Sequence, residues 1–305
     1  MKLSKRHLAI LALIAGSIIW GAAAPIFKWS MEEIPPFTLA TLRFSLAALL
    51  ILPFAYKKIG IRESDFLKLL CLAFIGITLH IGLFFAGLQL TSSINVPILN
   101  SITPIFLIFG SVWYLHEKLK IRVIIGTLIS MTGILLIILE PLLVKGPDGS
   151  ILGNTLILLS VLCVVIYTLL LKRFALPYPI ITIVFWTFLL GAFLFLPAFI
   201  IEGITLHPFA HMDEKAFIGI FYGAIFSSAL AYFCYNFGIQ YIKANEIGVF
   251  TYIEPIITIL IAIPLLGEKI YPLYVVGASI VFLGIFIAEA KLHYQPHHLL
   301  SKKPN

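Results

Sequence analysis

Ten apolar runs, each long enough to cross a lipid bilayer, constrain this chain more than any other feature. A helix needs about 20 mostly apolar residues to span the hydrocarbon core. Because water is absent there, a spanning segment has to satisfy its own backbone hydrogen bonds, and these runs are too long and too uniformly apolar for barrel strands. We therefore expect an all-α polytopic membrane protein with ten transmembrane helices, at residues 8–27, 36–56, 66–88, 93–115, 121–140, 153–172, 179–201, 216–239, 245–266 and 272–290.

The composition supports a membrane location. Hydrophobic residues make up 61% of the chain and charged residues only 11%. A soluble domain would carry about 25% charged residues. The first apolar run follows basic residues, but at about 20 residues it exceeds the core of a cleaved signal peptide, so we expect a retained first span.

The basic residues indicate the orientation of the chain. If the ten runs cross the membrane in turn, 16 of the 21 Lys and Arg residues fall on one side. Cytoplasmic loops carry an excess of Lys and Arg, so this side and both termini are predicted to be cytoplasmic. The net charge of +7 then follows from topology, and we expect no nucleic-acid partner.

The second half of the chain repeats the first. Several residues recur at a constant spacing of 151 positions. The pairs are Glu117 and Glu268, Pro104 and Pro255, Gly87 and Gly238, Gly126 and Gly277, and Gly133 and Gly284. The first two spans of each half pair at 144 positions instead, through Pro35 and Pro179, Thr38 and Thr182, Phe44 and Phe188, and Pro53 and Pro197.

Each half holds five predicted spans, an odd number, so the second half has to cross the membrane in the opposite sense. We expect two inverted five-helix repeats, residues 1–145 and 146–290, followed by a polar cytoplasmic tail at 291–305. Inverted repeats commonly build secondary transporters with a substrate site near mid-bilayer.

These features together resemble the EamA-like family of the drug/metabolite transporter superfamily, over about residues 8–290. The resemblance rests on the two sets of five spans, a polar residue followed by Pro in spans four and nine, and a Glu ending each of those spans (LHEKL, LLGEKI). It rests also on the G-x6-G of the following spans and the arginine in TLRFSLAALL. It implies movement of small metabolites, often amino acids or their derivatives and frequently outward, across a bacterial or archaeal cytoplasmic membrane. It implies neither a particular substrate nor an oligomeric state.

A glutamate and a proline lie together midway through predicted span nine. Pro255 cannot donate a hydrogen bond to the carbonyl oxygen of Thr251, and Pro104 likewise frees that of Asn100. Freed acceptors at membrane depth are tolerated where they are buried in protein or line a watery cavity. We interpret both prolines as structural hinges. Two interpretations of Glu254 stay open: it binds substrate or a proton, or it is a structural carboxylate bonded to a neighbouring helix.

Further polar and aromatic residues are predicted to line a pathway between spans three, four, eight and nine, with contributions from one and six. Aromatic rings beside a few hydrogen-bonding groups suit an amphipathic solute such as a neutral or aromatic amino acid. Packing and bilayer-interface roles remain alternatives, and the histidine either relays protons or bonds a neighbouring helix. The predicted substrate-pathway residues are Trp20, His80, Asn100, Thr103, Tyr167, Tyr232, Asn236, Thr251 and Glu254.

Three other charges are interpreted as structural. Arg43, within span two, is expected to cap carbonyl groups or to extend outward, and binding of a substrate carboxylate is the alternative. Glu117 and Glu268 end spans four and nine, where the dipole of the next helix favours a carboxylate. We expect both to be architectural.

An enzyme is not expected, because the three aspartates are all predicted to lie in loops and no HExxH sequence is present. The three cysteines fall in different spans without CxxC spacing, so we predict neither a metal site nor another cofactor. The expected partners are a small-molecule substrate and the lipid bilayer, and proton coupling depends on Glu254. The alternative functions are a membrane-embedded small-molecule sensor and a channel-like facilitator.

Overall fold

The computed structural model describes residues 5–103, 105–106, 110, 121–145, 151–174, 177–210, 212–241, 250 and 253–289. Regular structure in these parts of the chain is helical throughout, which confirms the all-helical part of the expected fold class for them. Six helical segments are long and apolar enough to cross a membrane, and three shorter apolar helices accompany them. The number of ten spans stays a prediction, because much of 93–115 lies outside the described residues.

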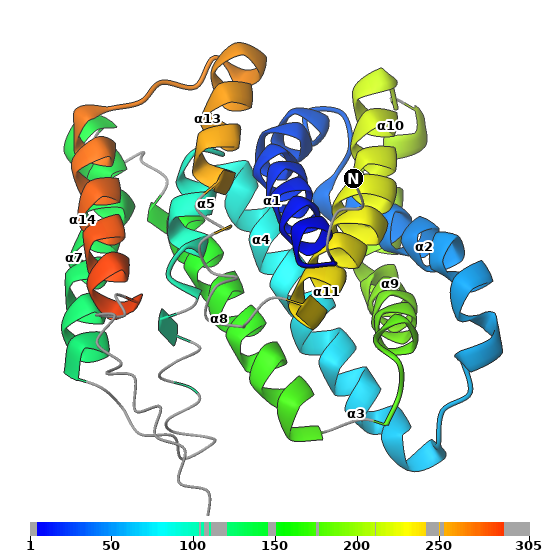
Figure 1. Ribbon diagram of the computed structural model, residues 1–305. Coiled ribbons are helices and arrows are strands. Elements are labelled where there is room, and N and C mark those ends of the chain that lie inside the picture. Colours follow the sequence, from blue (N-terminus) through cyan, green and yellow to red (C-terminus); the bar gives the residue numbers. More distant parts are fainter. Residues whose placement is uncertain are drawn as a thin grey trace, which may run out of the picture.

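The helices pack into one bundle, shown in Figure 1. The first half provides α1 (Lys5–Ser30), α2 (Pro36–Ala55), α3 (Glu63–Ala73), α4 (His80–Leu90), α5 (Asn95–Asn100) and α7 (Ile121–Lys145). The second half provides α8 (Ile151–Phe174), α9 (Ile180–Leu206), α10 (Glu214–Phe221), α11 (Ala231–Tyr241), α13 (Ile253–Leu266) and α14 (Pro272–Glu289).

The repeat is visible in the helix boundaries. Helix α4 begins at His80 and α11 begins at Ala231, which is 151 positions later. Each of these helices directly follows a π-helical segment, Phe74–Leu79 before α4 and Tyr222–Leu230 before α11. Because π-helical turns are rare, their recurrence at the same place in both halves is structural support for the duplication.

Repeat-related helices pack against each other in opposite directions. The Thr38 hydroxyl near the start of α2 donates to the Glu202 carboxylate near the end of α9, at 2.8 Å. At the other end of the pair, the Thr182 hydroxyl near the start of α9 donates to the Lys58 carbonyl oxygen after α2, at 3.0 Å. Thr182 lies 144 positions after Thr38, and Glu202 lies 144 positions after Lys58. The two contacts therefore join equivalent positions of the two halves. This antiparallel arrangement is the one that an inversion requires.

The repeat-related helices α7 and α14 also pack against each other, and they lie side by side at one edge of the bundle in Figure 1. A Cβ atom added to Gly133 would lie 2.6 Å from the carbonyl oxygen of Gly277. Gly284 lies equally tightly against the backbone of Gly126. These glycines let two backbones approach closely, as small residues do at helix interfaces in membranes.

The centre of the bundle is filled with aromatic side chains. Phe44 and Phe188, which are repeat mates, pack with ring centroids 5.2 Å apart between α2 and α9. Phe27 of α1 and Phe85 of α4 form an edge-to-face pair at 5.3 Å. All four rings are almost fully buried. The core therefore lies where the two halves meet.

We predict that Gly284→Ala destabilises the protein, because the added methyl group would collide with backbone atoms of α7. Overpacking of this kind costs about 1–3 kcal/mol. Gly203→Ala in α9 is the matched control, since a Cβ atom there meets nothing within 4 Å. Thermal unfolding in detergent should show a lower melting temperature for Gly284→Ala only, and equal temperatures for the two variants would contradict the α7–α14 contact.

Candidate functional site

The structure brings two of the predicted pathway residues together. Trp20 of α1 and Tyr232 of α11 form an edge-to-face pair with ring centroids 5.7 Å apart. Tyr232 also packs on Phe188 at 5.3 Å, and the Trp20 indole nitrogen donates to the Ser227 carbonyl oxygen at 3.1 Å. This acceptor lies in the π-helical segment before α11. The aromatic cluster therefore joins α1, α9 and α11 at the irregular part of the second half.

Arg43 is buried beside this cluster, with only 4% of its surface exposed. Its Nε atom donates to the Ser228 hydroxyl at 3.0 Å and an Nη atom donates to the Ser227 hydroxyl at 3.2 Å. The guanidinium lies 4.7 Å from the ring centroids of both Phe27 and Phe44. The ion pairs found in the described part of the chain do not include Arg43. A positive charge is thus held inside the bundle by neutral groups.

Glu254 lies in the first turn of α13, against α1. A Cβ atom added to Gly21 would lie 2.8 Å from the Glu254 backbone oxygen, and the Thr258 hydroxyl donates to the Gly21 carbonyl at 2.6 Å. The Glu254 side chain is half-buried and has no hydrogen-bond or ion-pair partner among the described residues. Pro255 lies beside Glu254 near the start of the described part of α13 and is buried.

His80 and Tyr167 form a second group on the other half. The His80 Nδ1 atom lies 3.0 Å from the Ser160 carbonyl oxygen of α8. The Tyr167 ring covers Gly76, in the π-helical segment before α4. His80 lies near Arg43, and Tyr167 lies near Tyr232. Ser227 and Ser228 in one π-helical segment hold Arg43, and Gly76 in the other lies under Tyr167.

The remaining predicted residues are only partly described. The Thr103 hydroxyl donates to the Asn100 carbonyl oxygen at 2.6 Å, which supplies a partner for the acceptor that a proline at position 104 leaves free. Pro104, Glu117 and Thr251 lie outside the described residues, as does the side chain of Asn236.

Glu268 belongs to a polar hub that the sequence did not predict as a unit. The hub consists of Lys28, Ser92, Ser93 and Glu268. The Glu268 carboxylate accepts hydrogen bonds from the Ser92 hydroxyl at 2.6 Å, the Ser93 N–H at 2.7 Å and the Ile94 N–H at 3.1 Å. Lys28 of α1 forms an ion pair with it at 3.0 Å. The carboxylate thus accepts hydrogen bonds from the segment between the end of α4 and the start of α5.

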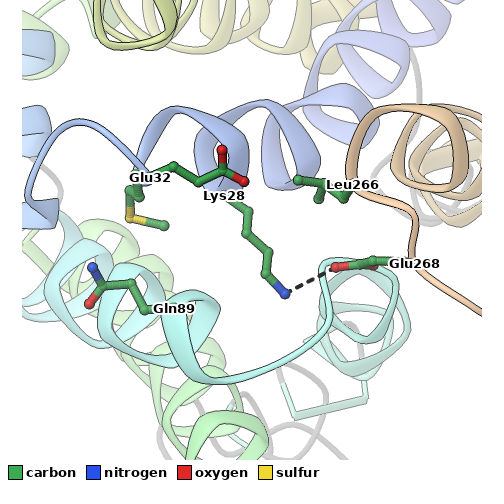
Figure 2. A pocket seen from close by; sticks show the side chains of 6 residues that line it. Lys28, Glu32, Gln89, Leu266 and Glu268 are labelled. Carbon is green, nitrogen blue, oxygen red and sulfur yellow. Dashed lines mark hydrogen bonds and ion pairs between the residues drawn. The ribbon is translucent and has the colours of Figure 1, made fainter. Parts of the chain in front are cut away.

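A cavity of about 340 Å3 lies beside the hub. Figure 2 shows the Lys28 ammonium group directed toward Glu268, with Gln89 of α4 across the cavity. The lining residues are Lys28, Met31, Glu32, Gln89, Leu266 and Glu268. Lys28 falls on the side that the sequence predicts to have few basic residues, and this exception to the charge bias was the sequence signal that could have pointed to the hub.

A second buried carboxylate was also missed. Glu202 of α9 accepts hydrogen bonds from the backbone N–H groups of Phe37 at 3.1 Å and Thr38 at 2.6 Å. The first N–H groups of a helix have no partner within that helix, so Glu202 completes the start of α2. Its only sequence signal is an acidic residue near the end of an otherwise apolar span.

The fold and these sites define a helical membrane protein of the transporter class, with charged and aromatic residues enclosed where two repeated halves meet. The chain belongs to the EamA-like transporter family, whose model matches residues 7–139 and 151–289. This result confirms the resemblance read from the sequence.

Similar proteins agree with this assignment. The chain is 28% identical to an uncharacterized transporter of Archaeoglobus fulgidus, over 95% of this chain and 99% of the relative. It is 27% identical to the uncharacterized transporter YetK of Bacillus subtilis, over 93% of this chain and 87% of the relative. One crystal structure of a protein shares the fold, with a TM-score of 0.65 and 16% identity, covering 93% of this chain and 97% of the other.

The hub generates a prediction about pH. Burial raises the pKa of Glu268, but the charge of Lys28 and the hydrogen bonds from Ser92 and Ser93 outweigh it, so the pKa lies below the ordinary 4.5. The ionised carboxylate therefore stabilises the fold above pH 4.5, and this contribution is lost as the pH falls through the lower pKa of the folded state.

We expect the melting temperature of Glu268→Gln to lie below that of the wild type at neutral pH, and the difference to shrink below pH 4.5. Glu63→Gln, at an exposed glutamate, is the control and should leave the melting temperature unchanged at every pH. A difference for Glu268→Gln that is constant with pH would contradict the assignment.

Proposed function

We propose that the protein is a secondary transporter that exports small organic metabolites, chiefly amino acids or their derivatives, by alternating access around a mid-membrane site. In this proposal residues 1–145 and 146–290 are the two inverted repeats. Both termini and the tail 291–305 face the cytoplasm, and the protein resides in the cytoplasmic membrane of a bacterium or archaeon. The transporter family and the antiparallel packing of repeat-related helices support this arrangement.

One observation carries the choice of substrate: among the described residues, neither Arg43 nor Glu254 has an ion-pair partner inside the bundle. In that part of the chain Arg43 is bonded to hydroxyl groups and lies against aromatic rings, and Glu254 has no hydrogen-bond partner. Ionised groups at membrane depth are costly unless they are paired or functional. An α-amino acid supplies a carboxylate for the guanidinium and an ammonium group for the carboxylate. Its binding would therefore offset both costs at once.

The aromatic cluster fits the rest of such a solute. Trp20 packs on Tyr232 near Arg43, and it directly precedes Gly21, which lies against the backbone of Glu254. Aromatic faces bind apolar or aromatic side chains and also attract an ammonium group. A neutral or aromatic amino acid therefore suits this environment better than a sugar or an inorganic ion.

The outward direction in this proposal rests on the family resemblance, and proton coupling rests on Glu254. A carboxylate that binds either a substrate ammonium group or a proton exchanges the two during a cycle, since both bind to the same oxygen atoms. Replacing it with glutamine removes the charge and keeps the shape. The coupling proposal can therefore be tested separately from the transport proposal.

We predict that proteoliposomes loaded with a mixture of the common amino acids lose a few of them selectively when they contain the wild-type protein. An imposed pH gradient should change the rate. Glu254→Gln should lower the initial rate by at least about tenfold and abolish its response to the gradient. The readout is mass spectrometry of the external solution, and Glu63→Gln is the matched control with the same substitution on an exposed residue.

The outcomes separate the candidate functions. Release of small solutes without selectivity would favour the channel-like facilitator. Selective binding without release would favour the sensor. Unchanged transport in Glu254→Gln would show that the carboxylate is structural.

A further inference from the structure

The Lys28–Glu268 ion pair holds together segments that belong to different halves of the protein. Lys28 lies near the end of α1, and Glu268 lies in the connection between α13 and α14. The Lys28 ammonium group also donates to the Thr91 carbonyl oxygen, directly after α4. Glu268 in turn accepts from Ser93 at the approach to α5. This ion pair therefore holds together the end of α1, the α13–α14 connection and the chain between α4 and α5.

The ion pair is placed to stabilise the interruption between α4 and α5. The end of a helix carries partial negative charge on its carbonyl groups, and the start of a helix carries partial positive charge on its N–H groups. Lys28 lies against the former and Glu268 against the latter. Separating the two side chains would remove partners from both backbone ends, so this face of the bundle opens only if other partners are supplied.

A second partner for Lys28 is present in the same cavity. Glu32 follows Lys28 by four residues, just after the end of α1, and both line the 340 Å3 cavity, where Figure 2 shows them with Glu268. The Glu32 carboxylate is held by Lys215 at 2.6 Å, but its side chain is 51% exposed. The Glu268 side chain is only 10% exposed. Glu32 is thus the more accessible of the two carboxylates that line the cavity together with Lys28.

We propose that Lys28 is the switch of an outer gate: its ion pair with Glu268 keeps this end of the bundle closed, and its transfer to Glu32 accompanies opening. This inference rests on the proposed function, which places the hub on the outer face and requires alternating access. The cavity supplies space for the transfer. Lys28 is paired with a carboxylate in each state, and Glu268 keeps its hydrogen bonds from Ser92, Ser93 and Ile94 when the ammonium group leaves.

The test measures access to the interior and needs no substrate. The three native cysteines, Cys71, Cys163 and Cys234, are first replaced by serine. Ala24→Cys then places a thiol one helical turn below Lys28, at a position that is 4% exposed in the closed state. The measured quantity is the rate at which a membrane-impermeant maleimide modifies this cysteine, in right-side-out and inverted vesicles.

We expect Glu268→Gln and Lys28→Gln each to raise the modification rate in right-side-out vesicles by about tenfold, because charge-assisted hydrogen bonds that hold the gate closed are lost. Lys28→Arg keeps the charge and should stay within about twofold of the parent. Glu32→Gln removes the alternative partner and should lower the rate. Asp65→Asn, which breaks the 2.8 Å ion pair with Lys68 within α3, is the control and should change nothing.

Equal rates in the parent, Glu268→Gln and Lys28→Gln would overturn the gate, and so would an acceleration confined to inverted vesicles. If Glu268→Gln fails to give monodisperse protein, the Lys28 variants carry the test, since that residue makes fewer contacts. A faster rate in Glu32→Gln than in the parent would overturn the partner exchange. Modification as predicted in a protein that moves no amino acid would keep the gate and refute the proposed substrate.

Discussion

The requirement that polar backbone groups find partners without water governs this structure. Within a helix the requirement is met locally, but each helix start or interruption leaves N–H groups exposed to an apolar environment. At two such places the missing partner is a carboxylate from the other half of the chain. Glu202 completes the start of α2, and Glu268 completes the interruption between α4 and α5. The first half therefore depends on the second for these hydrogen bonds as well as for its packing.

The same requirement explains where the polar centre lies. A π-helical turn leaves a carbonyl or N–H group out of the regular pattern, and in both halves it precedes the helix that faces the middle of the protein. Trp20 uses one such carbonyl, that of Ser227, and the hydroxyls of Ser227 and Ser228 hold Arg43. The π-helical segment thus supplies the hydrogen-bond acceptors for both Trp20 and Arg43, so irregular backbone, an aromatic cluster and a charge occur together.

Much of the fold follows from the sequence, because apolar spans, charge bias and repeat spacing extend over many residues and can be recognised without a structure. The pairing of Thr38 with Thr182 indicated which helices correspond, and the structure places them in equivalent contacts. The candidate site was harder to predict from the sequence. Trp20 and Tyr232 were selected as aromatic residues in spans, but their contact depends on how α1 and α11 pack. Glu202 and Lys28 were missed, because a carboxylate that caps a distant helix and an ion pair across 240 positions leave no local pattern.

The doubled contacts have a consequence for the energy of the transport cycle. If the two halves were identical, exchanging their conformations would give a second state of equal free energy, facing the opposite side. Departures from identity set the balance between the two states. The serines of the hub are such a departure: by the spacing of 151 positions, Ser92 and Ser93 correspond to Lys243 and Ala244, which lack hydroxyl donors. In the proposed transport cycle, the preference for one resting state is therefore encoded where the repeat is imperfect.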